Sequence, residues 1–381
     1  MKEQIEQEKL RLIVFKSALE LGNMVDKHLV EKYELDPEKN TFIVPIKEYF
    51  FEDGHLKTEI QQTVRGKDMF FLTDIGNYSI EYKIHGFTNH ASPNDLVAQL
   101  KDCINAGSRH NDKVNVIMPL LYNGRQHRRN CRESLSCGDN LAEFDRLAKM
   151  KSFITFDAHD QGVEHACRNM EFDNFYASDV ILEQFIKDRS LDELKSIIFV
   201  APDNGAVGRR SLYLNSFVTP SIHREAGMFV KQRDLNTFVD GKHPILSHDY
   251  SGNNDIEGKT AIVIDDMISS GASIFDVVKE LKKRKVGNVY VIATYVLFTK
   301  GIDEFEKLYR EGKLAGIYTT NLSYIPEEYK KAEWLHICDC SKEIADIIYN
   351  IHNDLSISDI LRDRSSSIRL LERKFNGQTE E

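Results

Sequence analysis

The chain has 381 residues, enough for about two domains of roughly 150 residues each. With 41% hydrophobic and 29% charged residues it has the composition of a globular protein, and its net charge of -10 argues against a nucleic-acid partner, because phosphate contacts need a basic face. No apolar run approaches the ~20 residues that span a bilayer, and the charged N-terminus lacks a signal-peptide core, so we expect a cytoplasmic protein with no membrane partner.

Short apolar runs rich in Val, Ile and Phe predict buried strands along the chain. In order, they lie at residues 69–72, 114–121, 153–156, 197–201, 261–264 and 289–296. Amphipathic patterns at 96–104 and 274–281 predict helices between them. Because parallel strands are buried on both faces and are connected by helices, this alternation indicates an α/β fold with mainly parallel sheets flanked by helices.

The predicted elements fall into two blocks. The first covers residues 1–175 and the second 176–345, and we expect each block to form a domain. A polar stretch at 232–258 interrupts the second block and predicts a long loop, which in a compact domain is usually functional or mobile. Residues 346–381 predict a C-terminal helical extension.

The strongest local signal begins at the strand predicted over 261–264. Two carboxylates, Asp265 and Asp266, follow this strand directly. A loop of small residues comes next and leads into a predicted helix. The loop contains Ser269, Ser270, Gly271, Ala272 and Ser273. Such a loop offers backbone N–H groups and the positive end of the helix dipole to a phosphate. Adjacent carboxylates can accept hydrogen bonds from a vicinal diol. The pattern therefore predicts a site for a ribose phosphate, with an ordinary helix N-cap as the alternative.

A histidine and a further acidic residue follow two other predicted strands. His159 follows the strand at 153–156 and is flanked by acids, and Asp203 follows the strand at 197–201. Together with the Asp265-Asp266 pair they suggest a site for a cation and a phosphate at the carboxyl edge of the sheets. Taken alone, each has a structural alternative: a structural histidine in one case, an Asx turn in the other.

Two groups of basic residues stand out against the acidic background. Residues 125–129 follow the strand at 114–121, and residues 231–233 follow the apolar residues 228–230 at the start of the long polar stretch. Arginine binds phosphate through paired hydrogen bonds and lysine acts as a point charge. Their position directly after strands favours phosphate binding, and a solvated basic surface is the alternative.

Together these motifs resemble those of the ribose-phosphate pyrophosphokinase family, in the family's order from residue 51 to residue 321. The similar segments are Phe51-Glu-Asp53-Gly-His55, Val64-Arg-Gly-Lys-Asp68, Tyr122-Asn-Gly-Arg125-Gln126-His127-Arg128, Asp157-Ala-His159, Ala201-Pro-Asp203-Asn-Gly205, Lys231-Gln-Arg233 and the loop from Asp265 to Ser273. A phosphoribosyl-binding loop alone would be shared with salvage transferases, and the other motifs narrow the resemblance. It implies two phosphoribosyltransferase-like domains.

The resemblance also implies an activity. The β,γ-pyrophosphoryl group of ATP would pass, with Mg²⁺, to the 1-hydroxyl of ribose 5-phosphate, giving phosphoribosyl pyrophosphate and AMP. The implied residues are Lys231 and Arg233 for catalysis; Phe51, Asp53, His55, Arg125, Gln126 and Arg128 for ATP; Asp265, Asp266, Ser269, Ser270, Gly271, Ala272 and Ser273 for ribose 5-phosphate; and His159 and Asp203 for the metal. A homo-oligomer, dimer or hexamer, is implied too, with Phe51 serving a neighbouring subunit's site.

The sequence also departs from the family motifs. His55 stands where the family has Glu, His127 where it has Asp and Ser269 where it has Asp, and extra residues lie within 75–93. Three other functions therefore stay open beside the implied one. They are pyrophosphoryl transfer to a larger acceptor that contains ribose 5-phosphate, phosphoribosyl transfer, and non-catalytic regulation through a bound phosphoribosyl ligand.

Overall fold

The structure, a computed structural model, describes residues 8–107, 110–129, 132–217, 225–233, 245–253, 255–358, 360 and 365–376. The chain divides into two compact units. The first comprises Met1–Tyr176, Asn321–Tyr324 and Asp339–Arg362, and the second Ala177–Thr320, Ile325–Cys338 and Asp363–Glu381. The segment expected as a separate extension, residues 346–381, is thus shared between the two units.

A parallel five-stranded sheet in the order β1-β4-β7-β8-β9 forms the centre of the first unit. Its strands are β1 (Leu10–Val14), β4 (Asp68–Leu72), β7 (Lys113–Ile117), β8 (Met150–Phe156) and β9 (Glu171–Phe175). Two antiparallel hairpins accompany it, β2 (Ile46–Phe50) with β3 (Leu56–Ile60) and β5 (Glu81–Ile84) with β6 (Phe87–His90).

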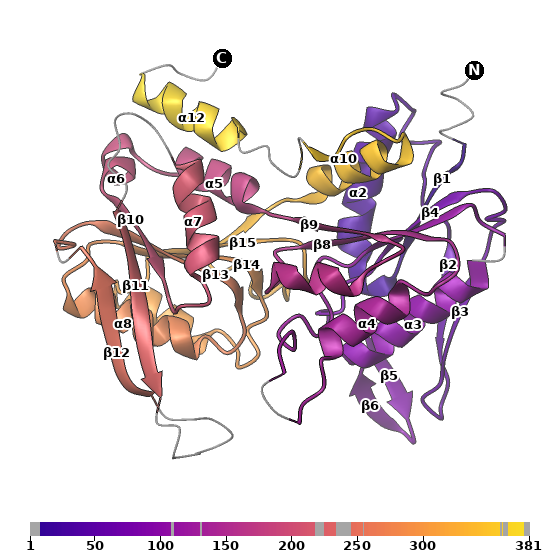
Figure 1. Ribbon diagram of the computed structural model, residues 1–381, viewed down its shortest axis with the longest axis horizontal. Coiled ribbons are helices and arrows are strands. Elements are labelled where there is room, and N and C mark those ends of the chain that lie inside the picture. The colour runs from indigo at the N-terminus through magenta and orange to yellow at the C-terminus, as the bar shows by residue number, and fades with distance from the viewer. Residues whose placement is uncertain are drawn as a thin grey trace. The chain divides into compact units, whose positions relative to one another are not determined.

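The helices of this unit cover both faces of its sheet. They are η1 (Lys16–Ala18), α2 (Leu19–Lys32), α3 (Pro93–Gly107), α4 (Ser136–Phe144), η2 (Gln161–Ala166) and α10 (Ser341–His352). Figure 1 shows α2 and α10 on one side of the sheet and α3 and α4 on the other.

The second unit contains a seven-stranded sheet in the order β12-β11-β10-β13-β14-β15-β16, parallel except for the β11–β12 pair. Its strands are β10 (Ile197–Ala201), β11 (Glu225–Arg233), β12 (Ile245–Gly252), β13 (Thr260–Ile268), β14 (Val289–Val296), β15 (Gly316–Thr320) and β16 (Leu335–Cys338). Its helices are α5 (Ser178–Lys187), α6 (Leu191–Lys195), α7 (Val207–Ser216), α8 (Ala272–Lys283), α9 (Asp303–Arg310) and α12 (Ser365–Phe375).

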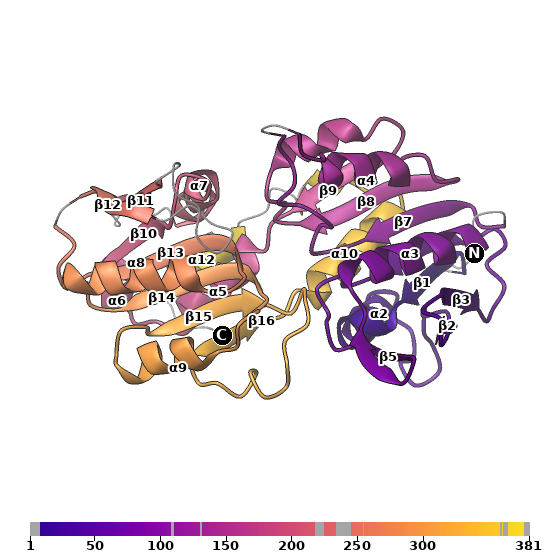
Figure 2. The ribbon, with the colours of Figure 1, turned by 90° about the horizontal axis from the view of Figure 1, so that it is seen from below.

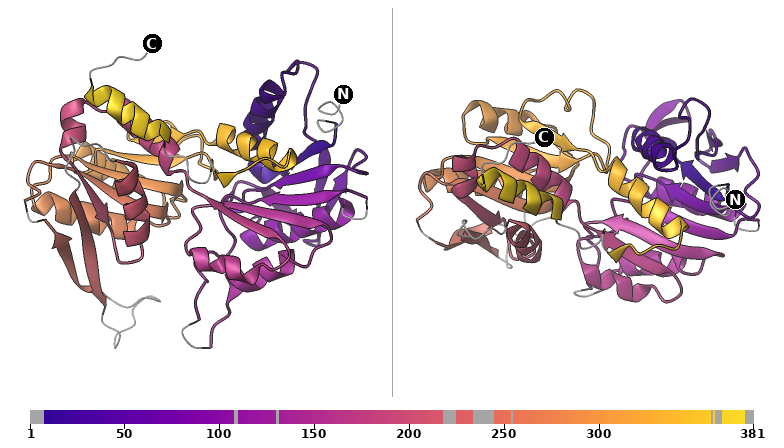
Figure 3. Two further views of the ribbon diagram at one scale, coloured as in Figure 1. Left: turned by 45° about the horizontal axis from the view of Figure 1, so that its top comes forward. Right: turned by 90° about the horizontal axis from the view of Figure 1, so that it is seen from above.

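Helices cover both faces of this sheet as well. Figure 2 shows α8 on the face opposite α5, and Figure 3 shows α12, drawn in yellow, lying along α5. None of the helices in the described part of the chain combines the length and the apolar character that crossing a membrane requires.

Burial explains why the central elements form where the sequence predicts them. Every residue of β14 is buried, as expected for a central strand of a parallel sheet. In α8 the buried residues Ile274, Val277, Val278 and Leu281 recur at helical spacing and join the core, while Lys282 and Lys283 occupy the last turn beside the negative end of the helix dipole. The predicted α/β fold with parallel sheets is confirmed.

Three local predictions are corrected by the structure. The strand expected over 114–121 ends at Ile117, because Pro119 has no N–H to continue the ladder. Part of the polar stretch at 232–258 is not a loop, because residues 245–252 form β12 and pair with β11. Strand β13 continues past residue 264 to Ile268, so Asp265 and Asp266 lie inside the strand, where its pairing with β14 persists. Residues 234–244 lie outside the described part.

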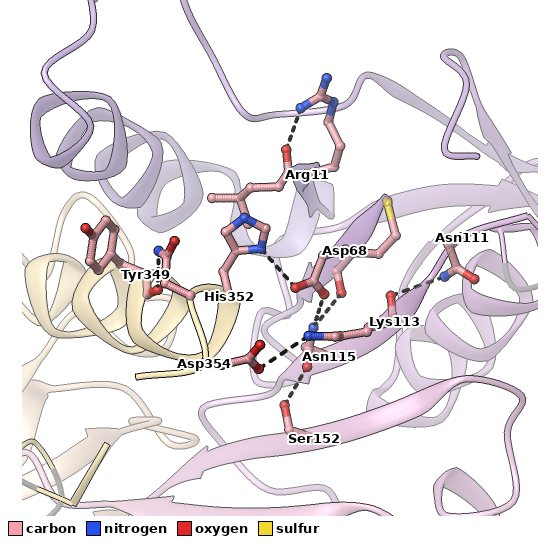
Figure 4. A network of polar contacts seen from close by, with 12 residues as sticks. Arg11, Asp68, Asn111, Lys113, Asn115, Ser152, Tyr349, His352 and Asp354 are labelled. Atoms are coloured by element: carbon pink, nitrogen blue, oxygen red, sulfur yellow. Dashed lines mark hydrogen bonds and ion pairs between the residues drawn. The ribbon is translucent and has the colours of Figure 1, made fainter. Parts of the chain in front are cut away.

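A buried polar network fastens α10 to the sheet of the first unit (Figure 4). His352, the last residue of α10, lies 2.9 Å from the Asp68 carboxylate at the start of β4. Asn115 of β7 donates to the other carboxylate oxygen at 2.8 Å and accepts at 2.8 Å from the Ser152 hydroxyl of β8. Because each of these side chains is buried and paired, the network specifies where α10 docks.

Candidate functional site

The phosphoribosyl-type loop of the second unit has the predicted strand, loop and helix geometry. Ser269 and Ser270 follow β13, and Gly271 precedes α8 as its N-cap. Because glycine has no side chain, it leaves the first N–H groups of α8 uncapped, and they face the loop with the positive end of the helix dipole. Ala272 and Ser273, both exposed, begin the helix. This arrangement can bind a phosphate.

Gly271 is required by the shape of the loop. Its φ is +80°, a left-handed conformation that L side chains rarely adopt. A Cβ at this position would also lie 2.5 Å from Cζ of Phe305 and 2.6 Å from Cζ of Phe275. The two phenyl rings contact each other edge to face beneath the turn, so the loop lies directly on the aromatic core.

The two carboxylates of β13 are close to each other and mostly shielded from water. Asp266 is 3% exposed, and burial, followed by the charge of Asp266, raises the pKa of Asp265 well above its usual range. Arg209 of α7 supplies a counter-charge, with its Nη1 3.7 Å from Oδ1 of Asp266. A buried acidic pair of this kind favours further positive charge nearby, either from a cation or from hydrogen-bond donors of a ligand.

Asp203 makes the Asx turn that is the structural alternative for this position. Its Oδ1 accepts from the backbone N–H of Gly205 at 2.9 Å and of Ala206 at 3.2 Å, directly after β10. Its charge also contributes to raising the pKa of Asp265, so Asp203 belongs to the same electrostatic group as the acidic pair. The turn does not exclude a metal-binding role, because the other carboxylate oxygen takes no part in these two hydrogen bonds.

The backbone of Lys231 and Arg233 ends strand β11 and pairs with β12, with an irregularity between residues 232 and 233. The side chains of both residues lie outside what the structure describes. Their predicted catalytic role therefore remains a prediction.

In the first unit, Phe51, Asp53 and His55 form the turn of the β2–β3 hairpin. Gly54 N–H donates to the Phe51 carbonyl at 2.9 Å, and Asp53 accepts from the His55 backbone at 3.0 Å and lies 3.1 Å from its ring. The Phe51 ring is 46% exposed and stacks at 6.4 Å on Tyr49. The turn thus presents an aromatic face and a carboxylate to solvent, which suits the recognition of a purine ring.

The range 75–93, in which we predicted extra residues, contains the β5–β6 hairpin, which packs against this turn. Tyr82 stacks on Phe50 with the ring centroids 4.6 Å apart, and Ile84 lies over Gly54, where an added Cβ would come within 2.9 Å of it. A tight turn with positive φ at His85 and Gly86 closes the hairpin. The hairpin therefore supports the turn that carries Phe51.

The loop 122–129 carries the other predicted nucleotide-binding residues. Arg125, Gln126 and Arg128 are all exposed, and Gln126 N–H donates to the Asn123 carbonyl at 2.7 Å. Among the described residues, no hydrogen bond, ion pair or ring contact joins this loop to the turn at 51–55. The structure thus places the predicted ATP-binding residues in two separate groups within the first unit.

His159 follows β8 at a sharp bend. Asp157 has a φ of +44°, and its N–H donates to the Phe175 carbonyl at 2.8 Å, while Ala158 N–H donates to Asn174 Oδ1 at 2.9 Å. These two bonds hold the bend against β9. The ring of His159 lies 5.2 Å, centroid to centroid, from that of His127 in the loop 122–129, so the structure brings these two predicted segments together.

Two residues near these sites were not among the predicted site residues. Arg209 is the counter-charge of the acidic pair, and its signal was a basic Arg-Arg sequence just after the Asp203 turn. Asp160 contacts both His127 and Arg128, and its signal was only that it follows His159 directly. The contact of Arg209 with Asp266 and the contacts of Asp160 with the loop 122–129 could not be predicted from sequence spacing, because each joins different elements that are far apart along the chain.

The donor set of the second unit suits Mg²⁺. This ion prefers carboxylate oxygens and is commonly held by one or two carboxylates together with substrate phosphates. Asp203, Asp265 and Asp266 offer such oxygens, and the raised pKa of Asp265 shows that positive charge would be favourable there. In the described part of the chain, no cluster of three or more His, Cys, Asp or Glu side chains is arranged to hold a metal by itself.

Two family models match the chain. The N-terminal domain of ribose phosphate pyrophosphokinase matches residues 10–144, and the phosphoribosyl synthetase-associated domain matches residues 219–362. Curated relatives named ribose-phosphate pyrophosphokinase include that of Gloeobacter violaceus, 25% identical over 93% of this chain and 94% of its own, and that of Synechococcus elongatus, 24% identical over 82% and 84%.

A solved structure has the same fold. The phosphoribosylpyrophosphate synthetase of Mycobacterium smegmatis gives a TM-score of 0.70 at 20% identity, covering 91% of this chain and 99% of its own. The match extends over both units, and with the two family models it confirms the fold of two phosphoribosyltransferase-like domains. The chain belongs to the ribose-phosphate pyrophosphokinase family, as a divergent member.

Proposed function

We propose that this chain is a ribose-phosphate diphosphokinase, which transfers the β,γ-pyrophosphoryl group of ATP to the 1-hydroxyl of ribose 5-phosphate. The observation that carries the proposal is the acidic pair of β13 followed by the loop that Gly271 closes onto α8. It combines a phosphate-binding helix start with carboxylates for the ribose hydroxyls. The family match adds the nucleotide and the pyrophosphoryl chemistry to this ribose phosphate site.

Each substrate has its own set of residues in this proposal. The loop from Ser269 to Ser273 holds the 5-phosphate, and Asp265 and Asp266 hold the ribose hydroxyls. The nucleotide is bound by Arg125, Gln126 and Arg128 and by the turn that contains Phe51, Asp53 and His55. Phe51 would serve a neighbouring subunit of a homo-oligomer.

Transfer of this kind requires in-line positioning and positive charge around the migrating group more than covalent chemistry from the protein. Lys231 and Arg233 supply that charge at the end of β11, and Arg209 keeps the acidic pair of β13 partly neutralised. Mg²⁺, when bound to the ATP phosphates, would neutralise charge that develops on them. Asp203 and His159 are each proposed as a ligand of Mg²⁺.

One assay tests the reaction. Purified protein with ATP, Mg²⁺ and ribose 5-phosphate should yield AMP and phosphoribosyl pyrophosphate, which carries a 5-phosphate and a 1-diphosphate, in equal amounts measured by mass spectrometry. ADP instead of AMP would contradict pyrophosphoryl transfer. Consumption of phosphoribosyl pyrophosphate with a nucleobase would indicate a phosphoribosyltransferase, turnover only with larger acceptors would indicate the altered acceptor, and ligand binding without turnover would indicate a regulator.

A single substitution tests the catalytic residue. Lys231→Ala should lower kcat by two or more orders of magnitude, because a donor aimed at developing charge is worth about 10²-fold or more. Folding should be unchanged. Lys313→Ala is the matched control, since Lys313 is a lysine of the same unit paired at 2.7 Å with Glu311. Wild-type turnover by Lys231→Ala would overturn this assignment.

A further inference from the structure

We propose that Asp160 is a positioning residue for the nucleotide, which ties the loop 122–129 to the end of β8 and so holds Arg128 ready for the phosphates of ATP. This inference rests on the proposed function, because it concerns how ATP is bound. It assigns a role to a residue outside the motifs that indicated the family.

The two oxygens of the Asp160 carboxylate have different partners. Oδ1 accepts from the N–H of Gly162 at 2.8 Å and caps the start of η2, which fixes the carboxylate in place. Oδ2 faces the loop 122–129, 3.2 Å from Nη2 of Arg128 and 3.4 Å from Nε2 of His127. One oxygen therefore anchors the residue, and the other holds the loop.

His127 connects this contact to His159. Its side chain is 13% exposed, and its ring lies against that of His159 while its Nε2 faces Asp160. Nδ1 of His127 is buried and has no hydrogen-bond partner among the described residues. The ring is thus packed between Asp160 and His159, so that the carboxylate, the loop and the histidine at the strand end form one assembly.

The sequence departure at residue 127 fits this assembly. The family motif has an aspartate in the loop at this position, whereas this chain has His127 there and a carboxylate 3.4 Å from its ring, on Asp160. The negative charge beside Arg128 therefore comes from the end of β8 and not from the loop itself.

Holding Arg128 has a physical benefit for binding. Its side chain is 75% exposed, and an exposed arginine loses conformational entropy when a ligand orders it. Contact with Asp160 restricts the guanidinium before the nucleotide arrives. Removing the contact should therefore weaken ATP binding and leave ribose 5-phosphate binding unaffected.

Asp160→Asn separates this role from a purely structural one. Asparagine caps a helix start as well as aspartate does, so the turn at Gly162 should persist and Tm should not change. The negative charge facing Arg128 is lost, and we expect the KM for ATP to rise about tenfold, as for the loss of one charge-assisted hydrogen bond. The KM for ribose 5-phosphate and kcat should stay at their wild-type values.

A second substitution tests whether Asp160 acts through Arg128. Arg128→Ala should also raise the KM for ATP, and the double variant should be little worse than either single one, because coupled residues are not additive. Glu171→Ala is the control: it breaks an exposed pair with Lys151 in the same unit and should alter neither constant.

Equilibrium titration with Mg²⁺ and α,β-methylene-ATP, which cannot be cleaved at the α–β bridge, measures the same effect without turnover. Weaker binding by Asp160→Asn supports the role of Asp160 whether or not the wild type forms AMP, which separates this inference from the proposed function. Wild-type affinity of Asp160→Asn for the analogue would overturn the inference, and so would an equal loss of ribose 5-phosphate affinity.

Discussion

Gly271 shows how one backbone conformation controls the phosphoribosyl-type loop. Its left-handed φ turns the chain from β13 into α8, and the rings of Phe275 and Phe305 fill the space where a side chain would be. The loop can therefore neither relax outward without breaking the turn nor accept a larger residue. The small residues therefore have two roles: they allow the loop to adopt this shape, and they leave room for a phosphate.

Gly271→Ala should raise the KM for ribose 5-phosphate and lower Tm, because the added Cβ is both strained in φ and overlaps two rings, at a cost of about 1–3 kcal/mol or more. Steady-state kinetics and thermal unfolding measure the two effects. Gly312→Ala is the control: Gly312 also has a positive φ, +65°, but nothing lies within 4 Å of its Cβ position. If both variants had the same KM, the loop would not depend on this shape.

Site residues that are contiguous in the chain could be predicted from the sequence. Site residues that depend on a contact with a side chain of another element could not. The loop from Ser269 to Ser273 is contiguous, so its residue types could be read directly. Arg209 and Asp160 act through side chains on other elements, and such pairings depend on how helices and strands pack. The carboxylate beside residue 127 is therefore visible only in the structure.

At the scale of elements, the β5–β6 hairpin lies within residues 75–93, the range in which we predicted residues beyond the family pattern. The extra residues could be located from the sequence, but their role could not, because it depends on the contacts of Tyr82 with Phe50 and of Ile84 with Gly54. A hairpin of two strands is barely stable by itself in water. Its packing against the turn at 51–55 stabilises both.

Tyr82→Ala should loosen the turn that presents Phe51 and raise the KM for ATP severalfold, since an aromatic pair contributes about 0.5–1.5 kcal/mol beyond the area it buries. The KM for ribose 5-phosphate is the internal reference. Phe87→Ser is the matched control, because the Phe87 side chain on the same hairpin is 74% exposed. An unchanged KM for ATP in Tyr82→Ala would show that the hairpin does not support the nucleotide site.

Strands were predicted best where they are central. The apolar runs of β4, β10 and β14 appeared as expected, since both faces of these strands are buried. Strand β12 was missed because its polar sequence gives no apolar run, and its pairing with β11 comes from hydrogen bonds between backbones. The end of β13 was placed too early, because its aspartates suggested a loop although the ladder with β14 continues.

At the scale of the whole molecule, the carboxyl group of Glu343 in α10 makes the free energy of unfolding depend on pH. Burial, and then the charges of Asp339 and Asp346, raise the pKa of Glu343 to about 7, and its buried Oε2 has no hydrogen-bond partner in the described part of the chain. Because the unfolded-state pKa is lower, at 4.5, ionisation disfavours the folded state. Stability is lost as pH rises from about 4.5 to about 7, and the full cost remains above that.

Glu343→Gln should therefore be more stable than the wild type at pH 8. The expected gain in the free energy of unfolding is roughly 1–3 kcal/mol, and the size of the pKa shift of Glu343 sets the upper limit. The difference should shrink towards pH 5, where the wild-type carboxyl is protonated in the folded state. Urea unfolding at the two pH values measures it. Glu38→Gln, at an exposed position of the same unit, is the control, and an equal gain at both pH values would contradict the mechanism.

The docking of α10 has a consequence for how the protein is made. Residues of the first unit come from both ends of the sequence, and the Asp68 carboxylate finds its partner His352 only 284 positions later. During synthesis the N-terminal sheet leaves the ribosome early but lacks this helix until nearly the whole chain has been translated. The face of α2 that α10 covers is exposed for that time, so the first unit is completed only after most of the second unit has been translated.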